Sequence, residues 1–153
     1  MTEKIKEYIL EGNYQSAENI CEKLDPSDVY KEILMLAYDM DSICVYSFIQ
    51  YMISKTNSIT WNELATEVMM HPLCYIEGAY SAALFHAREL LKLEYNANNL
   101  ERILFFYDIP EKLIKKSEAE AIAKELLNIE PDNKAAQHIL TGHPWSELLT
   151  DGN

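Results

Sequence analysis

The chain has 153 residues, 48% of them hydrophobic and 25% charged, which is the composition of a folded globular protein and excludes a disordered chain. Its formal net charge is −12, and its densest basic group, Lys112, Lys115 and Lys116, lies between acidic residues. Nucleic acids and anionic membrane surfaces bind clustered basic residues, so we expect neither of them as a partner.

Helices are predicted for the first third of the chain. Only three Val and nine Gly and Pro residues occur, which disfavours a sheet with many tight turns. Apolar residues recur at three- and four-residue spacing in residues 3–11, 14–24 and 28–39. Gly12 and Pro26 are the expected stop signals, and Ser27 is the expected N-cap of the third helix.

The next predicted helix, 42–54, is apolar around most of its circumference. A helix of this kind must be covered on several sides, so we expect it to be the central helix of the fold. Its 13 uncharged residues from Ser42 to Ser54 form the longest uncharged run, too short to span a bilayer.

The remaining elements are again helical in pattern, and no segment alternates with the period of a strand. The expected helices, capped at Thr60 and Ser117, are 60–70, 74–94, 99–107, 118–129 and 133–140. The prediction is an all-α fold of eight or nine helices, with neighbours packed antiparallel. We expect residues 1–142 to form a single domain, and the tail 143–153 to pack back through Trp145 and Leu148.

The three cysteines, Cys21, Cys44 and Cys74, form no disulfide framework and no CxxC pair. All three lie in apolar stretches, where a free cysteine usually behaves as a small buried hydrophobe. The start of the chain is charged and helical in pattern, unlike a secretory signal. The expected location is therefore the cytoplasm.

A G-x-Y-x-x-A pattern occurs at 12–17 and again at 78–83, each time followed by a helix, and 117–133 carries the second half of the same unit. Ala83 and Ala119 lie 36 residues apart. In these residues the chain resembles the tetratricopeptide repeat, a helix–turn–helix unit of about 34 residues. The resemblance departs at Tyr46, which replaces a small residue, and at His71-Pro72.

This resemblance implies antiparallel hairpins stacked as a short right-handed α-solenoid, because such units cannot bury their apolar faces alone. It also implies that the stack holds a peptide or a protein segment. An irregular helical bundle with chance matches is the alternative.

No signature of nucleotide binding or catalysis occurs, and Asp39-Met40-Asp41 lacks the remainder of a calcium loop. His71 and Cys74 could bind zinc, with His86 twelve residues beyond Cys74, but no fourth ligand has suitable spacing. We therefore expect a non-enzymatic protein without cofactor or metal. An enzyme or metal-dependent protein that uses His71, Cys74 and His86 is the alternative.

Met35, Tyr38 and Asp39 point away from the inward face of helix 28–39 and are the candidate contact residues. Packing against a neighbouring hairpin is an equally open interpretation of the first two. The acidic charge indicates a basic protein partner, bound by a monomer or a homodimer. A bacterial immunity-type protein that neutralises a toxin is a narrower version, which depends on charge and size alone.

Overall fold

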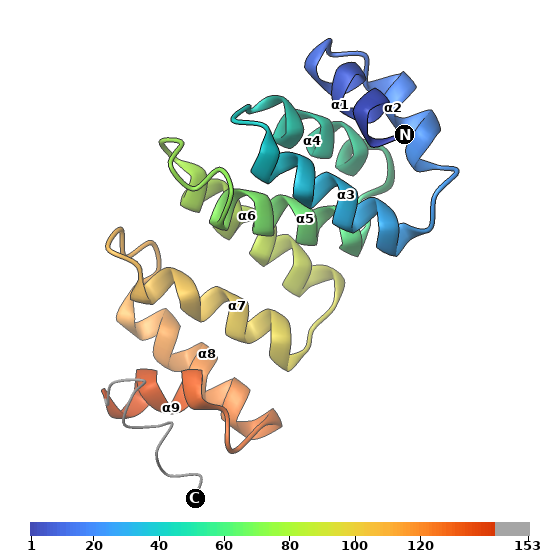
Figure 1. Ribbon diagram of the computed structural model, residues 1–153. Helices are drawn as coiled ribbons and strands as arrows, with labels where there is room; N and C mark the ends of the chain where they lie inside the picture. The colour runs from blue at the N-terminus through green and yellow to red at the C-terminus, as the bar shows by residue number, and fades with distance from the viewer. Residues whose placement is uncertain (143–153) are drawn as a thin grey trace, which may run out of the picture. The chain divides into compact units, whose positions relative to one another are not determined.

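The computed structural model describes residues 1–142, and all regular secondary structure in that range is α-helical (Figure 1). The prediction of an all-α fold is thus confirmed. Nine helices occur within these residues: α1 (Thr2–Leu10), α2 (Tyr14–Cys21), α3 (Pro26–Asp39), α4 (Cys44–Thr56), α5 (Ile59–Met70), α6 (Ala79–Leu93), α7 (Ala97–Asp108), α8 (Lys116–Ile129) and α9 (Lys134–Thr141). The tail, including Trp145 and Leu148, lies outside the described residues.

The helices form two compact units, Met1–His86 and Ala87–Asn153, and the boundary falls within α6. In the first unit α1 packs on α2 and α4, while α5 packs on α3 and α4. In the second unit α7, α8 and α9 pack on one another. Most contacts join helices that are consecutive or one apart along the chain, as in helical-repeat folds.

Polar caps define several helix starts. The side chains of Asn13, Ser58, Asn96 and Asn133 each accept a hydrogen bond from the backbone N–H of the third residue of the helix. The capping predictions were wrong in position: α3 begins at Pro26 after Asp25, α5 is capped by Ser58, and α8 starts after Lys115 with no side-chain cap bond.

The predicted helix 74–94 is shorter in the structure, because α6 begins at Ala79 and residues 71–78 form a series of turns. Gly78 immediately precedes the helix with φ +82°, and Gly12 precedes α2 with φ +71°. Glycine adopts this left-handed conformation without the steric cost that a Cβ would add. Both G-x-Y-x-x-A segments therefore start from a left-handed glycine at a helix entry.

Helix α4 packs against α1, α2, α3 and α5, as expected of a central helix, but α5 is the more buried of the two. Eight of the twelve α5 residues are buried, against four in α4. The apolar count of α4 includes Tyr46 and Tyr51, which are only half-buried and use their hydroxyls in hydrogen bonds. Tyrosine packs its ring while its polar end seeks a partner, so it does not demand full burial.

No helix of residues 1–142 is both long enough and apolar enough to cross a bilayer. Within the same residues, every fully buried side-chain nitrogen and oxygen has a hydrogen-bond partner. The core is dominated by side chains with almost no exposed surface, which include Ile5, Ile9, Ile33, Phe48, Leu64 and Phe106.

Candidate functional site

A groove of about 410 Å³ opens on the first unit, where the end of α2 and the start of α3 meet the end of α4 and the start of α5. This size lies within the range of about 300–1,000 Å³ typical of ligand pockets. The groove is formed by segments that are far apart in sequence, residues 18–29 and residues 52–61. Because it joins an apolar floor to acidic side chains at its edge, it is the candidate functional site.

The floor of the groove is apolar. Cys21, Val29, Met52 and Trp61 line it and are nearly buried, each with at most 8% of its surface exposed. The indole of Trp61 is held from behind by the ring of Phe48, with the centroids 5.8 Å apart and the planes nearly perpendicular. Removing such surfaces from water favours binding of an apolar group by about 25 cal/mol per Å².

Trp61 also has a hydrogen-bond donor without a partner within the described residues. Its backbone N–H donates to the Ser58 hydroxyl, which caps α5, whereas its indole N–H makes no hydrogen bond within residues 1–142. Because every fully buried side-chain nitrogen of the described residues has a hydrogen-bond partner, this unpartnered nitrogen must be in contact with solvent. A buried ring with an accessible N–H is a common anchor of protein interfaces.

Glu18 forms one rim of the groove and is held by three donors. Lys55 Nζ lies 2.5 Å from Oε2, the Tyr51 hydroxyl donates to the same oxygen at 2.7 Å, and Gln15 Nε2 donates at 2.9 Å. The bond from Lys55, followed by that from Tyr51, lowers the pKa of Glu18, and the Glu18 carboxylate in turn raises the pKa of Lys55. The pair is therefore fully charged at neutral pH.

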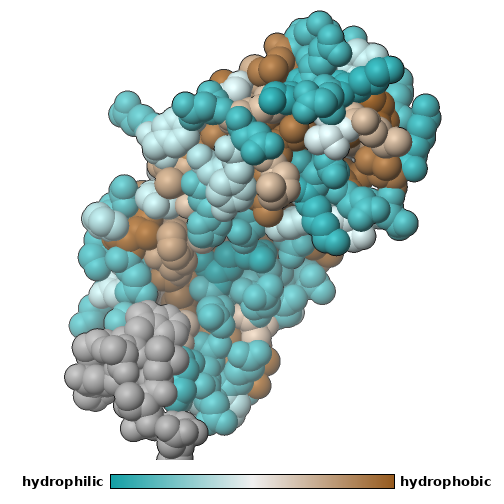
Figure 2. All heavy atoms as spheres, in the orientation of Figure 1, coloured by the Kyte–Doolittle hydropathy of each residue, from teal (hydrophilic) through white to brown (hydrophobic). Residues whose placement is uncertain are grey.

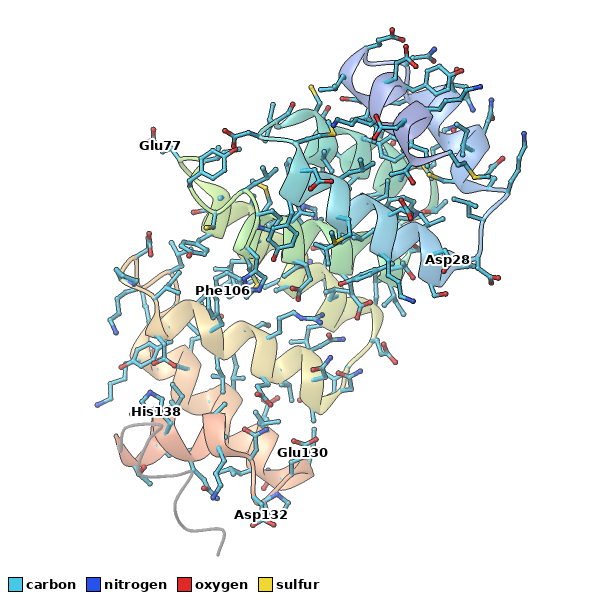
Figure 3. All side chains as sticks on the ribbon, in the orientation of Figure 1. Asp28, Glu77, Phe106, Glu130, Asp132 and His138 are labelled. Carbon is cyan, nitrogen blue, oxygen red and sulfur yellow. The ribbon has the colours of Figure 1, made fainter. Side chains whose placement is uncertain are left out.

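Glu22 forms another part of the rim and has no neutralising partner within residues 1–142. Asp25 and Asp28 follow on the same side of the first unit, also exposed and without an ion pair, and Asp28 is labelled in Figure 3 at the start of α3. Lys23 is the only basic residue between Glu22 and Asp28. An incoming cation would meet a local excess of negative charge here.

A second hollow of about 250 Å³ adjoins the groove, and Leu24 lines both. Its other walls come from α1 and α3, with Ile5 as an apolar contact, Asp28 and Glu32 as acidic contacts and Lys31 as a basic one. Leu24 is the one lining residue that the two hollows have in common.

The structure places Met35, Tyr38 and Asp39 on the exposed side of α3, as the helical spacing predicts. Met35 and Tyr38 expose 57% and 58% of their surfaces, so neither is packed under a neighbouring hairpin. On the face shown in Figure 2, apolar patches interrupt the hydrophilic surface of the first unit. Sequence reasoning identified these exposed residues but missed the groove, for which no local pattern gives a signal.

His71, Cys74 and His86 do not form a metal site, since residues 1–142 contain no cluster of three side chains able to hold a metal ion. His71 caps α5 and lies 3.4 Å from the Glu67 carboxylate. The prediction that Cys74 is buried was wrong, because it lies exposed in the turns before α6. Cys21 is buried as predicted, and Cys44 is half-buried.

His86 is a buried residue of a polar network rather than a ligand. Its Nε2 lies 3.0 Å from the Tyr46 hydroxyl and 2.8 Å from Gln50 Nε2, and its Nδ1 lies 3.3 Å from Asn62 Oδ1. These contacts are mutually consistent for a neutral ring that carries its proton on Nδ1 and accepts two bonds at Nε2. Burial raises the pKa of Tyr46, which keeps that hydroxyl available as a donor.

The hollows of the second unit have mixed charge. One is lined by Arg88 and Glu118, which form an ion pair of 2.9 Å. The other holds Asp108 and His138, 3.1 Å apart, with His138 labelled in Figure 3. Neither offers the combination of an apolar floor and uncompensated acids that the first unit has.

The chain gave no significant match to any protein-family model, to any curated protein or to any solved structure.

Proposed function

We propose that this chain is a non-enzymatic binding module that recognises a basic protein partner through the acidic surface of its first unit. The observation that carries the proposal is the uneven charge. Residues 1–86 hold thirteen acidic and five basic residues, whereas residues 87–142 hold ten and eight. A field of one sign steers association with a partner of the opposite sign.

The exposed apolar residues on this acidic unit support binding to a protein over simple solubility. Met35 and Tyr38 stand exposed beside Asp39 on α3, and residues of these types anchor interfaces more often than they occur on ordinary surface. Solubility alone is served by charge and gains nothing from exposed methionine and tyrosine.

The proposed tetratricopeptide-like repeat fits the same function. The left-handed Gly12 and Gly78, and the fully buried Ala17 and Ala83 that follow them, occupy equivalent places at two helix entries. In stacked hairpins, small residues of this kind let neighbouring helices approach closely and leave extended surfaces for a ligand.

Selection from a display library of short random peptides tests this function. We expect the enriched peptides to be rich in Lys and Arg, to contain apolar residues, and to bind more weakly as salt is added. Enrichment of acidic peptides, or binding that salt leaves unchanged, would contradict the proposal. If the double variant Met35→Ser/Tyr38→Ser binds the same peptides as well as wild type, these two residues lie outside the interface. The proposal of a basic partner would still stand.

A further inference from the structure

We infer that the groove between α2, α3, α4 and α5 binds an extended basic segment of a partner protein, with one apolar side chain inserted over Trp61. This inference deepens the proposed function and rests on it. It places the apolar anchor of the partner in a groove, in addition to the contacts proposed for the exposed face of α3.

The groove has the two features that such a segment needs. Its floor of Val29, Met52 and Trp61 can cover an aliphatic or aromatic side chain, and the free indole N–H can donate to a backbone carbonyl beside it. Its rim carries Glu22, whose carboxylate has no partner within the described residues. An apolar floor with a charged rim is the usual anatomy of a specific interface.

Glu22 also occupies a position where its negative charge destabilises a helix. It is the C-cap of α2, a helix with no basic residue in its last turn. The C-terminal end of a helix carries partial negative charge, so an acidic residue is unfavourable there. Glu11 occupies the same position at the end of α1, so this placement does not by itself indicate binding, but it implies that Glu22→Gln leaves the stability of the fold equal or higher.

The adjoining hollow favours an extended chain as the occupant over a small molecule. The groove and the hollow share Leu24 as a lining residue, and the hollow carries the acidic Asp28 and Glu32 beside the basic Lys31. A chain in extended conformation advances about 3.3 Å per residue, so a few residues reach from one depression into the next. Alternate side chains would then enter the groove while the others meet the acids.

Thr56 and Ser54 provide a matched pair of variants. Thr56 is exposed at the end of α4 and lines the groove, whereas Ser54 is exposed two residues earlier and does not. Thr56→Lys and Ser54→Lys change the total charge equally, and a lysine near the end of a helix favours its dipole. Only Thr56→Lys places the new cation at the rim.

The probe is the capped peptide Lys-Leu-Lys-Lys-Leu-Lys, and its dissociation constant is measured by titration with amide and indole NMR signals as the readout. We expect the NMR signals of Trp61 and Glu22 to shift. Thr56→Lys should bind the peptide with about fivefold lower affinity, because one added like-charge contact near water has about that effect. Ser54→Lys should change the affinity little. Glu22→Gln should also weaken binding while its melting temperature stays equal or rises, a result that loss of folding cannot produce.

Equal weakening by both lysine variants, shifts confined to the region of Met35 and Tyr38, or no saturable binding of the probe would overturn the inference. Equal affinity for Lys-Gly-Lys-Lys-Gly-Lys would do the same, because it would show attraction without an apolar anchor. A dimer in sedimentation that Thr56→Lys dissociates would assign the groove to a second copy of the chain. If basic peptides from the library still bind at another place, these failures overturn only the groove inference. If no basic peptide binds, the groove inference and the proposed function both fail.

Discussion

Glu18 is buried in the middle of α2 and is tied to α4 by Lys55 and Tyr51. Its three donors compensate for the removal of the carboxylate from water. Two of these bonds, from Tyr51 and Lys55, join residues 33 and 37 positions apart along the chain, so that the rim of the groove is fixed by the same contacts that hold α2 on α4.

The pH dependence of stability should reveal this pair. Because its contacts lower the pKa of Glu18 below the ordinary value of 4.5, the carboxylate stabilises the fold fully above that pH and loses this effect as the pH falls through its folded-state value. We expect Glu18→Gln to lower the melting temperature by a few degrees at pH 7, with a difference from wild type that shrinks below about pH 4.5.

Glu11→Gln is the matched control, because Glu11 is exposed and has no side-chain partner within the described residues. Thermal unfolding of the three proteins between neutral pH and pH 3 measures the effect. A constant difference between wild type and Glu18→Gln across this range would contradict the role assigned to the ion pair.

The cysteines should differ in reactivity. Burial raises the pKa of the Cys21 thiol to about 11, so only about one molecule in a thousand carries the reactive thiolate at pH 8. Cys74 is exposed. With a thiol reagent on the native protein we expect a fast phase that Cys74→Ser removes, and slow labelling of Cys21. Labelling of Cys21 as fast as Cys74 would show that the floor of the groove opens to solvent.

At the scale of the helices, packing depends on alanines at close contacts. Ala119 and Ala123 of α8 have no exposed surface, and α8 packs against both α7 and α9. A larger side chain at such a position has no space to occupy, so the neighbouring helix must shift.

We expect Ala119→Leu to lower the free energy of unfolding by about 1–3 kcal/mol. Ala121→Leu on the same helix is the control, because Ala121 is exposed and a surface substitution there should stay within about 0.5 kcal/mol. Denaturant unfolding of both variants measures the two values. Equal effects would indicate that α8 is not packed as described.

Most helices were predictable from local pattern, whereas the groove was not. Residues 118–129 and 133–140 carry period and stop signals strong enough to place α8 and α9 to within two residues. The start of α6 was misplaced, since the left-handed Gly78 ends the preceding turns and no apolar period marks that change. The groove arises where residues 18–29 meet residues 52–61, and only tertiary packing brings these together.

The exposed face of α3 was predictable because side-chain direction follows helical geometry once the buried face is known. The exposure of Cys74 was not, because an apolar neighbourhood in sequence says little about a residue in a turn. Burial in the loop before α6 depends on which side chains the backbone directs inward, here Leu73 with no exposed surface instead of Cys74.

At the scale of the whole molecule, the negative charge is concentrated in the first unit, which contains thirteen acidic residues and only five basic ones. The account therefore predicts that electrostatic attraction and one apolar anchor act together in binding. Salt separates these contributions, because it screens charges between exposed groups and leaves apolar burial intact.

The salt dependence of the dissociation constant for a peptide selected from the random library tests the central claim most directly. Between about 20 mM and about 500 mM salt the account predicts weakening of roughly tenfold or more, with residual binding from the apolar anchor. A dissociation constant that stays the same across this range would show that the acidic surface takes no part in recognition, and would contradict the account.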